Sequence, residues 1–355
     1  KLFDAAVLPA IFLGKKINTS KDTGKFSKIY ELHNKYRGEL TNKKNVYDIL
    51  RCPKDGYFSV DGKIFKKSSG VLRVGHTKES LWSLLSKSEY EWVKKVEDNS
   101  KHKIKDFFKV KVGIKTTADK VFIRDNWNDL NGLKPEEKLL KELISQENIK
   151  PWGTCNKKKL KVLYTHYSDK NGSKHVINLK NYPKANKYLK ENELQLKSRK
   201  YVIEAKRQWF EIWVPQNPSL WELPKIVFPD ISDVPRFYFD STGKIVNGNC
   251  YWIVGKINST EELLLIQGIS NSNLMTKYHD LVFNNKLYSG KRRYFSQYVE
   301  NYPLPSFDSN ISGEIIKIVK KLNATSIEKQ TKNLTQELEK LVGMAYNVEP
   351  VFNLD

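Results

Sequence analysis

The chain has 355 residues, of which 62 are Lys or Arg and 40 are Asp or Glu, so its formal net charge at pH 7 is +22. An apolar fraction of 39% with 12% aromatic residues is typical of a folded protein and excludes a disordered chain. No run of about twenty apolar residues exists, which excludes a membrane-spanning helix. Three separated cysteines (Cys52, Cys155 and Cys250) without a CxxC pair argue against disulfides or a zinc site, and favour a reducing cytoplasm.

The excess of positive charge indicates a polyanionic partner, because each Lys or Arg that neutralises a phosphate releases a condensed counterion. Biased composition is an alternative explanation. The chain is also rich in Asn and Ile, as an AT-rich genome would encode. Composition alone leaves both explanations open.

The chain opens with LFDAAVLPAIFLGKK, which is nearly continuous in apolar residues. It lacks the basic start and the small-residue cleavage site of a signal peptide. The pattern is typical of a buried strand in a parallel sheet that is covered on both faces. Since such a strand cannot stand alone, we expect residues 1–20 to be the end of a larger α/β domain.

Residues 21–105 are expected to form a connector with helices. The segments SKIYELHNKYRGEL and KESLWSLLSKSEYEWVKKVED carry apolar residues at three- and four-residue spacing, which predicts amphipathic helices. In the second segment, four side chains are expected to pack inward: Leu81, Leu84, Leu85 and Trp92.

Residues 106–258 change to short strand-like segments separated by turn residues. The β-branched and aromatic content predicts a mostly antiparallel β domain, interrupted by one helical insert, NYPKANKYLKENELQLKSRK. The expected strands are FFKVKVGIKTTADKVFIRD, KLKVLYTHYSD, RKYVIEAK, FEIWVPQ, PKIVFPDIS, RFYFDSTGKI and GNCYWIVGK.

Residues 259–355 are expected to be a helical region. TEELLLIQGISNSNLMTKYHDLVFN predicts a helix, and the tail after YPLPSF predicts two amphipathic helices. We expect the last helix to pack on its own protein and not in a coiled coil with a partner, because its heptad repeat of apolar residues is too short to indicate a coiled coil. The expected apolar stripe is Ile327, Leu334, Leu338, Leu341 and Ala345.

Motifs for several enzyme classes are missing. The sequence has no GxGxxG, GxxxxGK[ST] or HExxH string, which argues against dinucleotide-binding, P-loop and zinc-protease sites. His166 lies in strand-like sequence and is interpreted as a core or surface residue and not as a base. Glu204 and Lys206 form an ExK string after an expected strand, but no upstream Asp completes a nuclease metal site.

Seven strings, in order along the chain, resemble the C-terminal half of Taq-type adenine-N6 DNA methyltransferases, including fused restriction–modification enzymes. The most specific match runs from RQWFEIWVPQ through PKIVFPDIS to GNCYWI. Two positions depart from the family's pattern: Thr117 stands where many members have Gly, and Gln216 stands where they have Arg. The other matching strings are LFDAAVLPAIFLGKK, KVKVGIKTTADKVFI, ISQENIKPWGT, GISNSNLMTKYH, NYPLPSF and LEKLVGMAYNV.

The resemblance implies an α+β fold. It would combine remnant strands of an α/β methyltransferase sheet, a helical connector, a mostly antiparallel β target-recognition domain and C-terminal helices. It also implies an enzyme that flips an adenine out of double-stranded DNA and methylates it with S-adenosylmethionine. The Gly-rich turn and the Asn-Pro-Pro-Tyr loop of that chemistry are absent here. We therefore expect no catalytic residue and no bound cofactor in this chain, and a catalytic domain as its partner.

Phe3 has two interpretations, which the sequence leaves open. By resemblance it is the aromatic residue that stacks on the flipped adenine, since base–aromatic stacking contributes roughly 1–3 kcal/mol. Alternatively it is a core residue beside a strand end.

Basic and polar residues in turns beside aromatic strands are the candidates for DNA contact, because Arg, Lys and Asn can bind phosphates or base edges. Trp209 is also a candidate core residue, together with Trp213 and Trp221. The candidate contact residues are Lys115, Thr116, Thr117, Lys120, Trp152, Thr154, Asn156, Lys157, Lys158, Lys206, Arg207, Trp209, Arg236, Lys291, Arg292 and Arg293.

Two alternatives to a DNA-recognition module remain at this point. One is a stand-alone nucleic-acid-binding protein without catalysis. The other is a divergent nuclease whose site the motif search does not detect.

Overall fold

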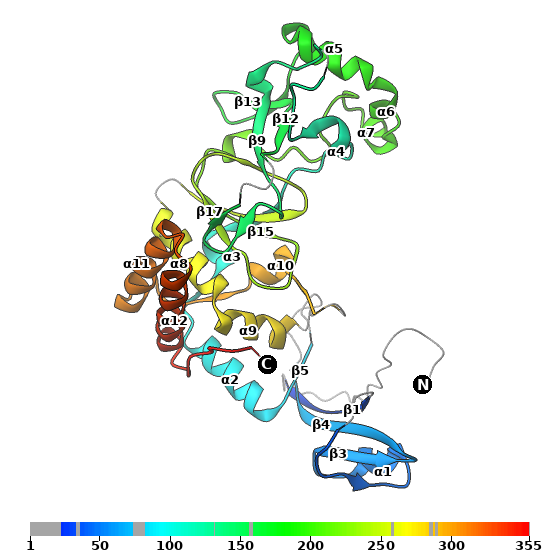
Figure 1. The fold of residues 1–355 in the computed structure, drawn as a ribbon, viewed down its shortest axis with the longest axis vertical. Coiled ribbons are helices and arrows are strands. Elements are labelled where there is room, and N and C mark those ends of the chain that lie inside the picture. Colours follow the sequence, from blue (N-terminus) through cyan, green and yellow to red (C-terminus); the bar gives the residue numbers. More distant parts are fainter. Residues whose placement is uncertain are drawn as a thin grey trace, which may run out of the picture. The chain divides into compact units, whose positions relative to one another are not determined.

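The computed structural model describes residues 23–32, 36–73, 82–130, 132–155, 159–256, 259–283, 287 and 290–354 (Figure 1). The strand expected within residues 1–20, and Phe3 with it, lie outside these residues. The chain divides into two compact units, one ending at Tyr90 and the other beginning at Glu91. No helix of the described residues is long and apolar enough to cross a membrane.

The first unit is a small β-sheet with one short helix. The strand order is β1-β4-β3-β2, and β5 also pairs with β4. The helix contributes Ile49 to a core that includes Phe58 and Val60. The elements are β1 (Thr23–Leu32), β2 (Thr41–Asn42), α1 (Val46–Arg51), β3 (Gly56–Val60), β4 (Lys63–Arg73) and β5 (Ser83–Leu85).

The helix predicted for SKIYELHNKYRGEL is wrong. This segment begins inside β1, which pairs antiparallel with β4 from Thr23↔Arg73 to Leu32↔Ile64. Ten residues of backbone pairing outweigh a weak helical spacing of apolar residues. The turn between β3 and β4 favours the sheet further, since Asp61 and Gly62 both have positive φ, as a two-residue hairpin turn requires.

The helix predicted around residue 90 is confirmed only in its second half, α2 (Lys87–Asp98), because β5 occupies the first half. Leu85 is buried, whereas Leu84 is 40% exposed and Trp92 is half-buried. Strand alternation explains the difference between the two leucines, since neighbouring residues point to opposite faces. Leu81 lies outside the described residues.

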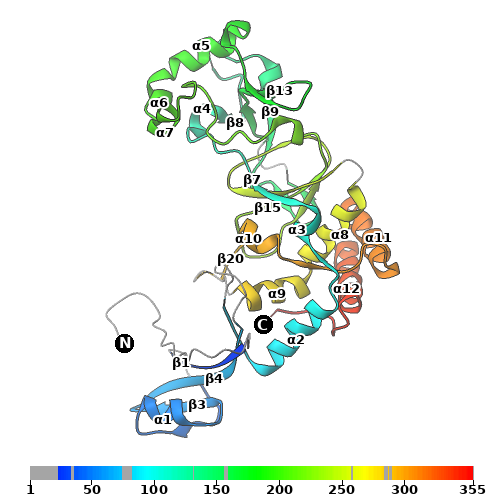
Figure 2. The same ribbon diagram turned by 180° about the vertical axis from the view of Figure 1, so that it is seen from behind.

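The second unit contains an antiparallel sheet with the strand order β17-β15-β19-β7. Its strands were expected from β-branched and aromatic runs, and all four lie within the expected segments. Figure 2 shows β7 and β15 from behind. The strands are β7 (Lys109–Val112), β15 (Lys225–Pro229), β17 (Tyr238–Asp240) and β19 (Cys250–Val254).

A second four-stranded sheet has the order β18-β9-β12-β8 and contains one parallel pair, β18 with β9. A single core cluster joins residues of the two sheets, among them Val162 and Trp252. The strands are β8 (Ile123–Arg124), β9 (Leu140–Ile144), β12 (Lys161–Leu163) and β18 (Ile245–Val246).

Short two-stranded pairings and single turns complete this part of the chain. They are β6 (His102–Lys103) with β21 (Pro303–Leu304), β10 (Ile149–Lys150) with β11 (Gly153–Thr154), β13 (His166–Ser168) with β14 (Lys174–Val176), β16 (Ile231–Ser232) with β20 (Arg292–Arg293), the helices α3 (Ile104–Phe107), α4 (Asp119–Phe122) and α10 (Ser296–Val299), and 3₁₀ turns at Glu137–Leu139, Leu179–Asn181 and Pro218–Leu220.

The helical insert is confirmed as α5 (Pro183–Glu191) and α6 (Glu193–Lys197). The strand predicted for RKYVIEAK is wrong, because α7 (Lys200–Glu204) follows directly and buries Val202. The strand predicted for FEIWVPQ is also wrong, since only Val214 makes a bridge there, to Lys115. In both segments single apolar side chains are buried against the core, although the backbone is not paired with a neighbouring strand. Their apolar residues therefore resembled those of a strand, which accounts for both errors.

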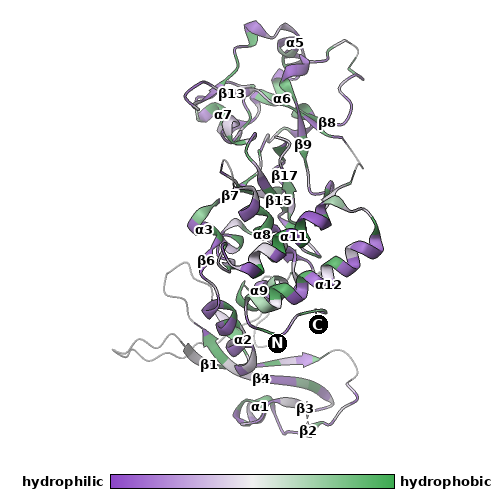
Figure 3. Cartoon of the chain, turned by 90° about the vertical axis from the view of Figure 1, so that its left-hand side faces the viewer, coloured by the Kyte–Doolittle hydropathy of each residue, from purple (hydrophilic) through white to green (hydrophobic). Residues whose placement is uncertain are grey.

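The C-terminal helices form as expected. The predicted helix after residue 259 is broken at Ser272 into α8 (Thr260–Asn271) and α9 (Asn273–Phe283). Helix α11 (Asn310–Ala324) contacts both α8 and α12 (Glu328–Ala345). Figure 3 shows hydrophobic and hydrophilic positions alternating along α12. In its stripe Leu338 is buried, whereas Ile327 is 56% exposed, just before the helix.

A buried ion pair joins two strands of the antiparallel sheet. Lys225 and Asp240 face each other across β15 and β17, both side chains are fully buried, and Nζ lies 3.0 Å from Oδ2. Nζ also donates to the carbonyl oxygen of Trp221 at 2.6 Å. Burial lowers the pKa of Lys225, and Asp240 partly offsets that effect.

We predict that Asp240→Leu lowers the free energy of unfolding by about 3–5 kcal/mol, because it leaves a buried ammonium group without its carboxylate. The double variant Lys225→Met with Asp240→Leu is expected to recover most of this loss, since no buried charge remains. Urea unfolding followed by tryptophan fluorescence measures both values. A double variant as unstable as the single variant would contradict the assignment.

Candidate nucleic-acid interface

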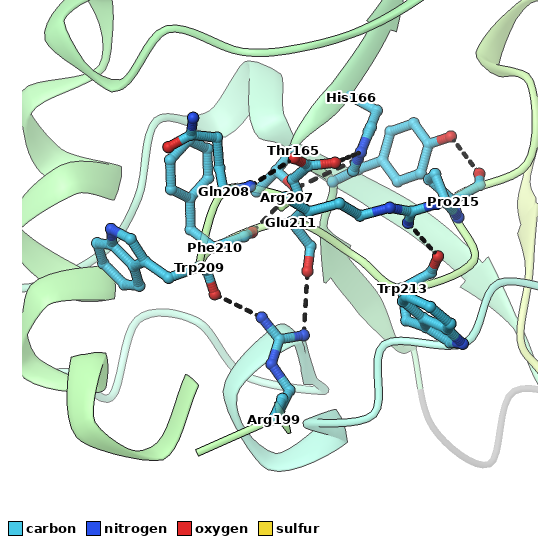
Figure 4. Close-up of polar contacts among 11 residues, drawn as sticks. Thr165, His166, Arg199, Arg207, Gln208, Trp209, Phe210, Glu211, Trp213 and Pro215 are labelled. Atoms are coloured by element: carbon cyan, nitrogen blue, oxygen red, sulfur yellow. Dashed lines mark hydrogen bonds and ion pairs between the residues drawn. The ribbon is translucent and has the colours of Figure 1, made fainter. Parts of the chain in front are cut away.

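Arg199 connects the turns that carry candidate contact residues. Arg199 is 6% exposed and donates to backbone carbonyl oxygens of three separate segments. Figure 4 shows its contacts with Trp209 and Glu211. Nη1 donates to Thr116 at 2.9 Å and to Glu211 at 3.0 Å. Nη2 donates to Trp209 at 2.5 Å and Nε to Leu196 at 3.0 Å. One guanidinium therefore fixes the turn after β7 and the loop after α7 relative to the end of α6.

The turn at residues 113–120 follows β7 and is held at both ends. Lys115 exchanges two backbone hydrogen bonds with Val214, each 3.0 Å long. The Thr116 hydroxyl donates to the Asp119 carboxylate and accepts from the backbone N–H of Ala118 at 3.1 Å. Thr116 is consequently buried, and its side chain stabilises the turn. The side chains that this turn presents to solvent are Lys115, Thr117, Asp119 and Lys120.

Thr117 has φ +59°, in the left-handed region that favours glycine. This conformation gives a physical reason for the Gly that many members of the resembling family have here. Gln216, the other departure from the family's pattern, has φ +62°, and its Nε2 donates to the carbonyl oxygen of Val112 at 2.7 Å. Both departures thus stand at backbone positions where an L side chain is strained.

Lys206 lies where α7 ends. Its N–H donates to the carbonyl oxygen of Ile203 at 2.8 Å, and the N–H of Arg207 donates to Val202 at 3.2 Å. With φ +55° at Lys206, this pattern is a Schellman cap, a position that glycine usually occupies. The cap leaves Lys206 exposed at the rim of the loop.

Arg207 lies over an indole ring. Its guanidinium lies 4.8 Å from the ring centroid of Trp213, and Nη1 donates to the carbonyl oxygen of the same residue at 2.6 Å. Tyr201 packs edge-on against Trp213 from α7. The ring contact and the hydrogen bond hold the guanidinium in place, and a planar guanidinium suits bidentate recognition of a phosphate or a guanine.

Glu211 and His166 form a polar pair behind this loop. Nε2 of His166 lies 3.4 Å from Oε2 of Glu211, and the other carboxylate oxygen accepts from the N–H of Gln208 at 2.7 Å. Burial lowers the pKa of His166. His166 was interpreted as a core or surface residue, and its exposure of 6% places it in the core.

A second group of candidates surrounds Arg236. Its Nη1 donates to the carbonyl oxygen of Gln146 at 2.9 Å and its Nε to the Ser232 hydroxyl at 2.9 Å. Its Nη1 also donates to the carbonyl oxygen of Ile149 at 3.4 Å, so Arg236 joins β10 of the hairpin that carries Trp152 and Thr154 to β16.

Within the basic triplet, Arg292 is buried and makes a bidentate ion pair with Asp280, both contacts being 2.7 Å long. Arg293 lies 3.5 Å from the Asp230 carboxylate and stacks 4.4 Å from the ring centroid of Phe295. Lys291 is exposed. The triplet thus uses Arg292 to hold the fold and presents Lys291 to solvent.

The structure divides the candidates into two groups and three degrees of exposure. The turn at 113–120 and the loop at 206–213 are brought together around Arg199. The other described candidates are Arg236 itself and residues of β10–β11 and of the segment at β20, which Arg236 connects through Ile149 and Ser232. Exposed candidates are Lys115, Thr117, Lys120, Thr154, Lys206 and Lys291; half-buried ones are Trp152, Arg207, Trp209, Arg236 and Arg293; buried ones are Thr116 and Arg292; and Asn156, Lys157 and Lys158 lie outside the described residues.

The tryptophan predictions are met to different degrees. Trp221 is 3% exposed and stacks on Trp252 at a centroid distance of 4.6 Å. Trp209 packs against the same core but is half-buried, as is Trp213. Of the three tryptophans, only Trp221 is therefore buried in the core.

Candidate metal ligands do not cluster among the residues that the structure describes. Among the described residues, no group of three or more His, Cys, Asp or Glu side chains could hold a metal ion. Glu204 is the last residue of α7 and Lys206 follows its cap, so the ExK string does not follow a strand.

Residues 141–304 match the family described as the TaqI-like C-terminal specificity domain. These residues are therefore similar to a TaqI-like C-terminal specificity domain. The match lies within the part of the sequence where the ordered strings predicted it, so the resemblance is confirmed. The matched residues include the loop around Arg207, the hairpin β10–β11 and the basic triplet.

Curated relatives are longer than this chain. Type II methyltransferase M.BanIII of Aneurinibacillus aneurinilyticus is 43% identical over 358 residues, which cover 98% of this chain and 62% of that protein. M.BstVI of Geobacillus stearothermophilus is 25% identical over 202 residues, or 56% of this chain and 33% of that protein. M.XhoI of Xanthomonas vasicola is 25% identical over 197 residues, or 56% of this chain and 34% of that protein. The chain thus spans 62% of one relative and about a third of the others.

A solved structure shares the fold. The Type IIL restriction-modification enzyme MmeI, solved in complex with DNA, superposes with a TM-score of 0.51 and 14% identity. The match covers 72% of this chain and 35% of the MmeI chain.

Arg199, the residue that connects the turn after β7 with the loop after α7, was not among the sequence candidates. It lies at the end of the predicted helical insert in LKSRKYV, where a charged residue is ordinarily solvated. Only its position one turn before the buried Val202 distinguishes it, and the sequence does not show that three segments converge there.

We predict that Thr117→Gly raises the free energy of unfolding by about 1 kcal/mol, because relief of left-handed strain outweighs the added entropy of glycine in the unfolded chain. Thr154→Gly, at an exposed position of β11 with negative φ, is the matched control and should be destabilising. Urea unfolding of both variants decides the sign. A lower free energy of unfolding for the Thr117→Gly protein would contradict the conclusion that the left-handed backbone of Thr117 is strained.

We predict that Arg199→Lys lowers the free energy of unfolding by about 3 kcal/mol, since an ammonium group cannot satisfy four spread carbonyl oxygens and leaves buried acceptors without donors. Arg207→Lys removes one hydrogen bond to a carbonyl oxygen and the contact of the guanidinium with the Trp213 ring. It should therefore lower the free energy of unfolding by about 1 kcal/mol or less. Parallel unfolding curves test the ranking, and equal destabilisation by the two substitutions would argue against Arg199 as the connecting residue.

Proposed function

We propose that this chain supplies DNA sequence recognition for an adenine-N6 DNA methyltransferase of a restriction–modification system, acting in the cytoplasm on double-stranded DNA. The specificity-domain match over residues 141–304 is the observation that carries the proposal. Similarity to M.BanIII over nearly the whole chain supports the methyltransferase class. In this proposal a catalytic domain, a partner of the residues described here, binds S-adenosylmethionine and flips the adenine.

The cofactor is assigned to that partner domain because the residues present here do not fit it. The sequence lacks the Gly-rich turn and the Asn-Pro-Pro-Tyr loop, so we derive no chemical step through S-adenosylmethionine. Phe3 remains a proposed stacking residue for the flipped base. The proposed domains are residues 1–20 as the end of the catalytic domain, 21–105 as connector, 106–258 as target-recognition domain and 259–355 as C-terminal helical region.

The geometry supports different kinds of DNA contact for different residues of the interface. Lys115, Lys120 and Lys206 project from turns whose backbones are fixed through Arg199, which suits phosphate contacts that set the register of the duplex. Arg207, stacked on Trp213, suits a contact to a base edge or a phosphate. Because the loops are held rigidly, little conformational entropy is lost on binding.

Selection from a random duplex library at near-physiological salt tests the proposal. A recurrent short motif that contains an adenine is the expected result. Salt-sensitive binding without any motif would instead identify a general polyanion binder, and cleavage of plasmid DNA with Mg²⁺ would identify a nuclease. Either outcome overturns sequence recognition by this chain alone.

We predict that replacing Lys115, Lys120 and Lys206 by Ala weakens duplex binding uniformly across sequences. Removing each ammonium–phosphate interaction should reduce the slope of log K against log salt by roughly 0.9. Titration at several salt concentrations measures it. The matched control replaces three exposed lysines of α12, Lys329, Lys332 and Lys340, and should leave the slope unchanged. An equal change in both triple variants would show that overall charge, and not these turns, holds the DNA.

A further inference from the structure

The β-sheet of the first unit has two faces of different character. Cross-strand partners share a face, so the register assigns each side chain. Phe58 and Phe65 are paired and pack with Ile49 of α1, which defines the helix-covered face. On the opposite face, Tyr30 pairs with Lys66, which pairs in turn with Tyr57.

Burial separates the two faces clearly. On the helix-covered face Phe58, Val60, Lys67 and Leu85 are buried. Among the described residues of β1, β3 and β4, none on the opposite face is buried, and Tyr30 is 43% exposed. We call this opposite face the open face; its members are Phe26, Lys28, Tyr30, Tyr57, Ile64, Lys66 and Ser68 with their cross-strand neighbours.

Aromatic rings and ammonium groups alternate on the open face. Lys66 Nζ lies 5.6 Å from the ring centroid of Tyr57, and Lys28 Nζ lies 5.8 Å from that of Phe26. Tyr36 stacks on Tyr57 at a centroid distance of 3.8 Å and an interplanar angle of 15°. Flat rings thus lie beside positive charges along one surface.

The net charge of residues 23–73 is positive. Residues 23–73 contain twelve Lys or Arg and five Asp or Glu. The carboxylate of β1, Glu31, pairs with Phe65 and so lies on the helix-covered face, while Lys28 and Lys66 lie on the open face. A polyanion is therefore the complementary ligand.

We propose that the open face binds an unpaired nucleic-acid strand, with bases stacking on its rings and phosphates contacting its lysines. Cations alone would suit a duplex backbone, but a duplex does not expose the flat faces of its bases. The exposed ring of Tyr30, with the half-buried rings of Phe26 and Tyr57 beside lysines, fits single strands, on which stacking contributes affinity without sequence preference. This site lies outside residues 141–304 and does not rest on the proposed recognition function.

The test measures binding of the whole chain to fluorescent oligo(dT) of about ten nucleotides, oligo(rU) of the same length and a matched duplex. Tyr30→Ala should weaken oligo(dT) binding about tenfold, whereas Tyr30→Phe, which keeps the ring, should bind like the parent. Tyr47→Ala is the matched control, because Tyr47 is 68% exposed on α1, which packs on the other face. Duplex affinity should be the same for all three variants.

Unfolding curves of each variant identify any weakening that arises from misfolding, and the Tyr30→Phe protein keeps the test valid in that case. Equal weakening by Tyr30→Ala and Tyr47→Ala, or no weakening by either, would overturn the proposal. An equally large effect on the duplex would overturn it as well, since it would indicate a backbone contact only. Tighter binding to oligo(rU) than to oligo(dT) supports the proposal and assigns the strand as RNA; the reverse assigns it as DNA.

Discussion

The candidate interface depends on one buried cation without a carboxylate partner. The Arg199 guanidinium is removed from water, and backbone carbonyl oxygens take the place of its hydration. Because four of its acceptors are main-chain carbonyl oxygens and only the Thr117 hydroxyl, at 3.5 Å, is a side-chain acceptor, the arginine mainly fixes backbone positions. A carboxylate partner would have satisfied the charge from a single residue, and the turn after β7 and the loop after α7 would then have lacked a common anchor.

Strained backbone lies close to this anchor. Thr117, Lys206 and Gln216 have positive φ, a conformation that costs non-glycine residues roughly 1–3 kcal/mol each. Such positions persist only where surrounding contacts hold them, and Arg199 contacts the segments that contain the first two. The side chains of Thr117 and Lys206 consequently reach solvent from rigid turns.

Positive charge serves two purposes in this protein, and the composition counts both alike. Lys67, Lys225 and Arg292 are buried and satisfy carbonyl oxygens or carboxylates of the fold. Lys115 and Lys120, in contrast, are exposed on a turn. The net charge therefore overstates the charge that faces a ligand, because a buried ammonium group cannot contact a phosphate.

The sequence by itself determined the α+β class, the C-terminal helices, the central strands of the antiparallel sheet and the resemblance to the specificity-domain family, because apolar periodicity and ordered motifs are local properties of the chain. It misassigned β1 as helix and α7 as strand, since short amphipathic segments have no intrinsic preference strong enough to resist pairing or packing. Only the tertiary structure decided which basic residues are exposed and that Arg199 joins three segments. Those outcomes depend on contacts between residues far apart in sequence, such as Arg199 with Thr116, and no local pattern encodes them.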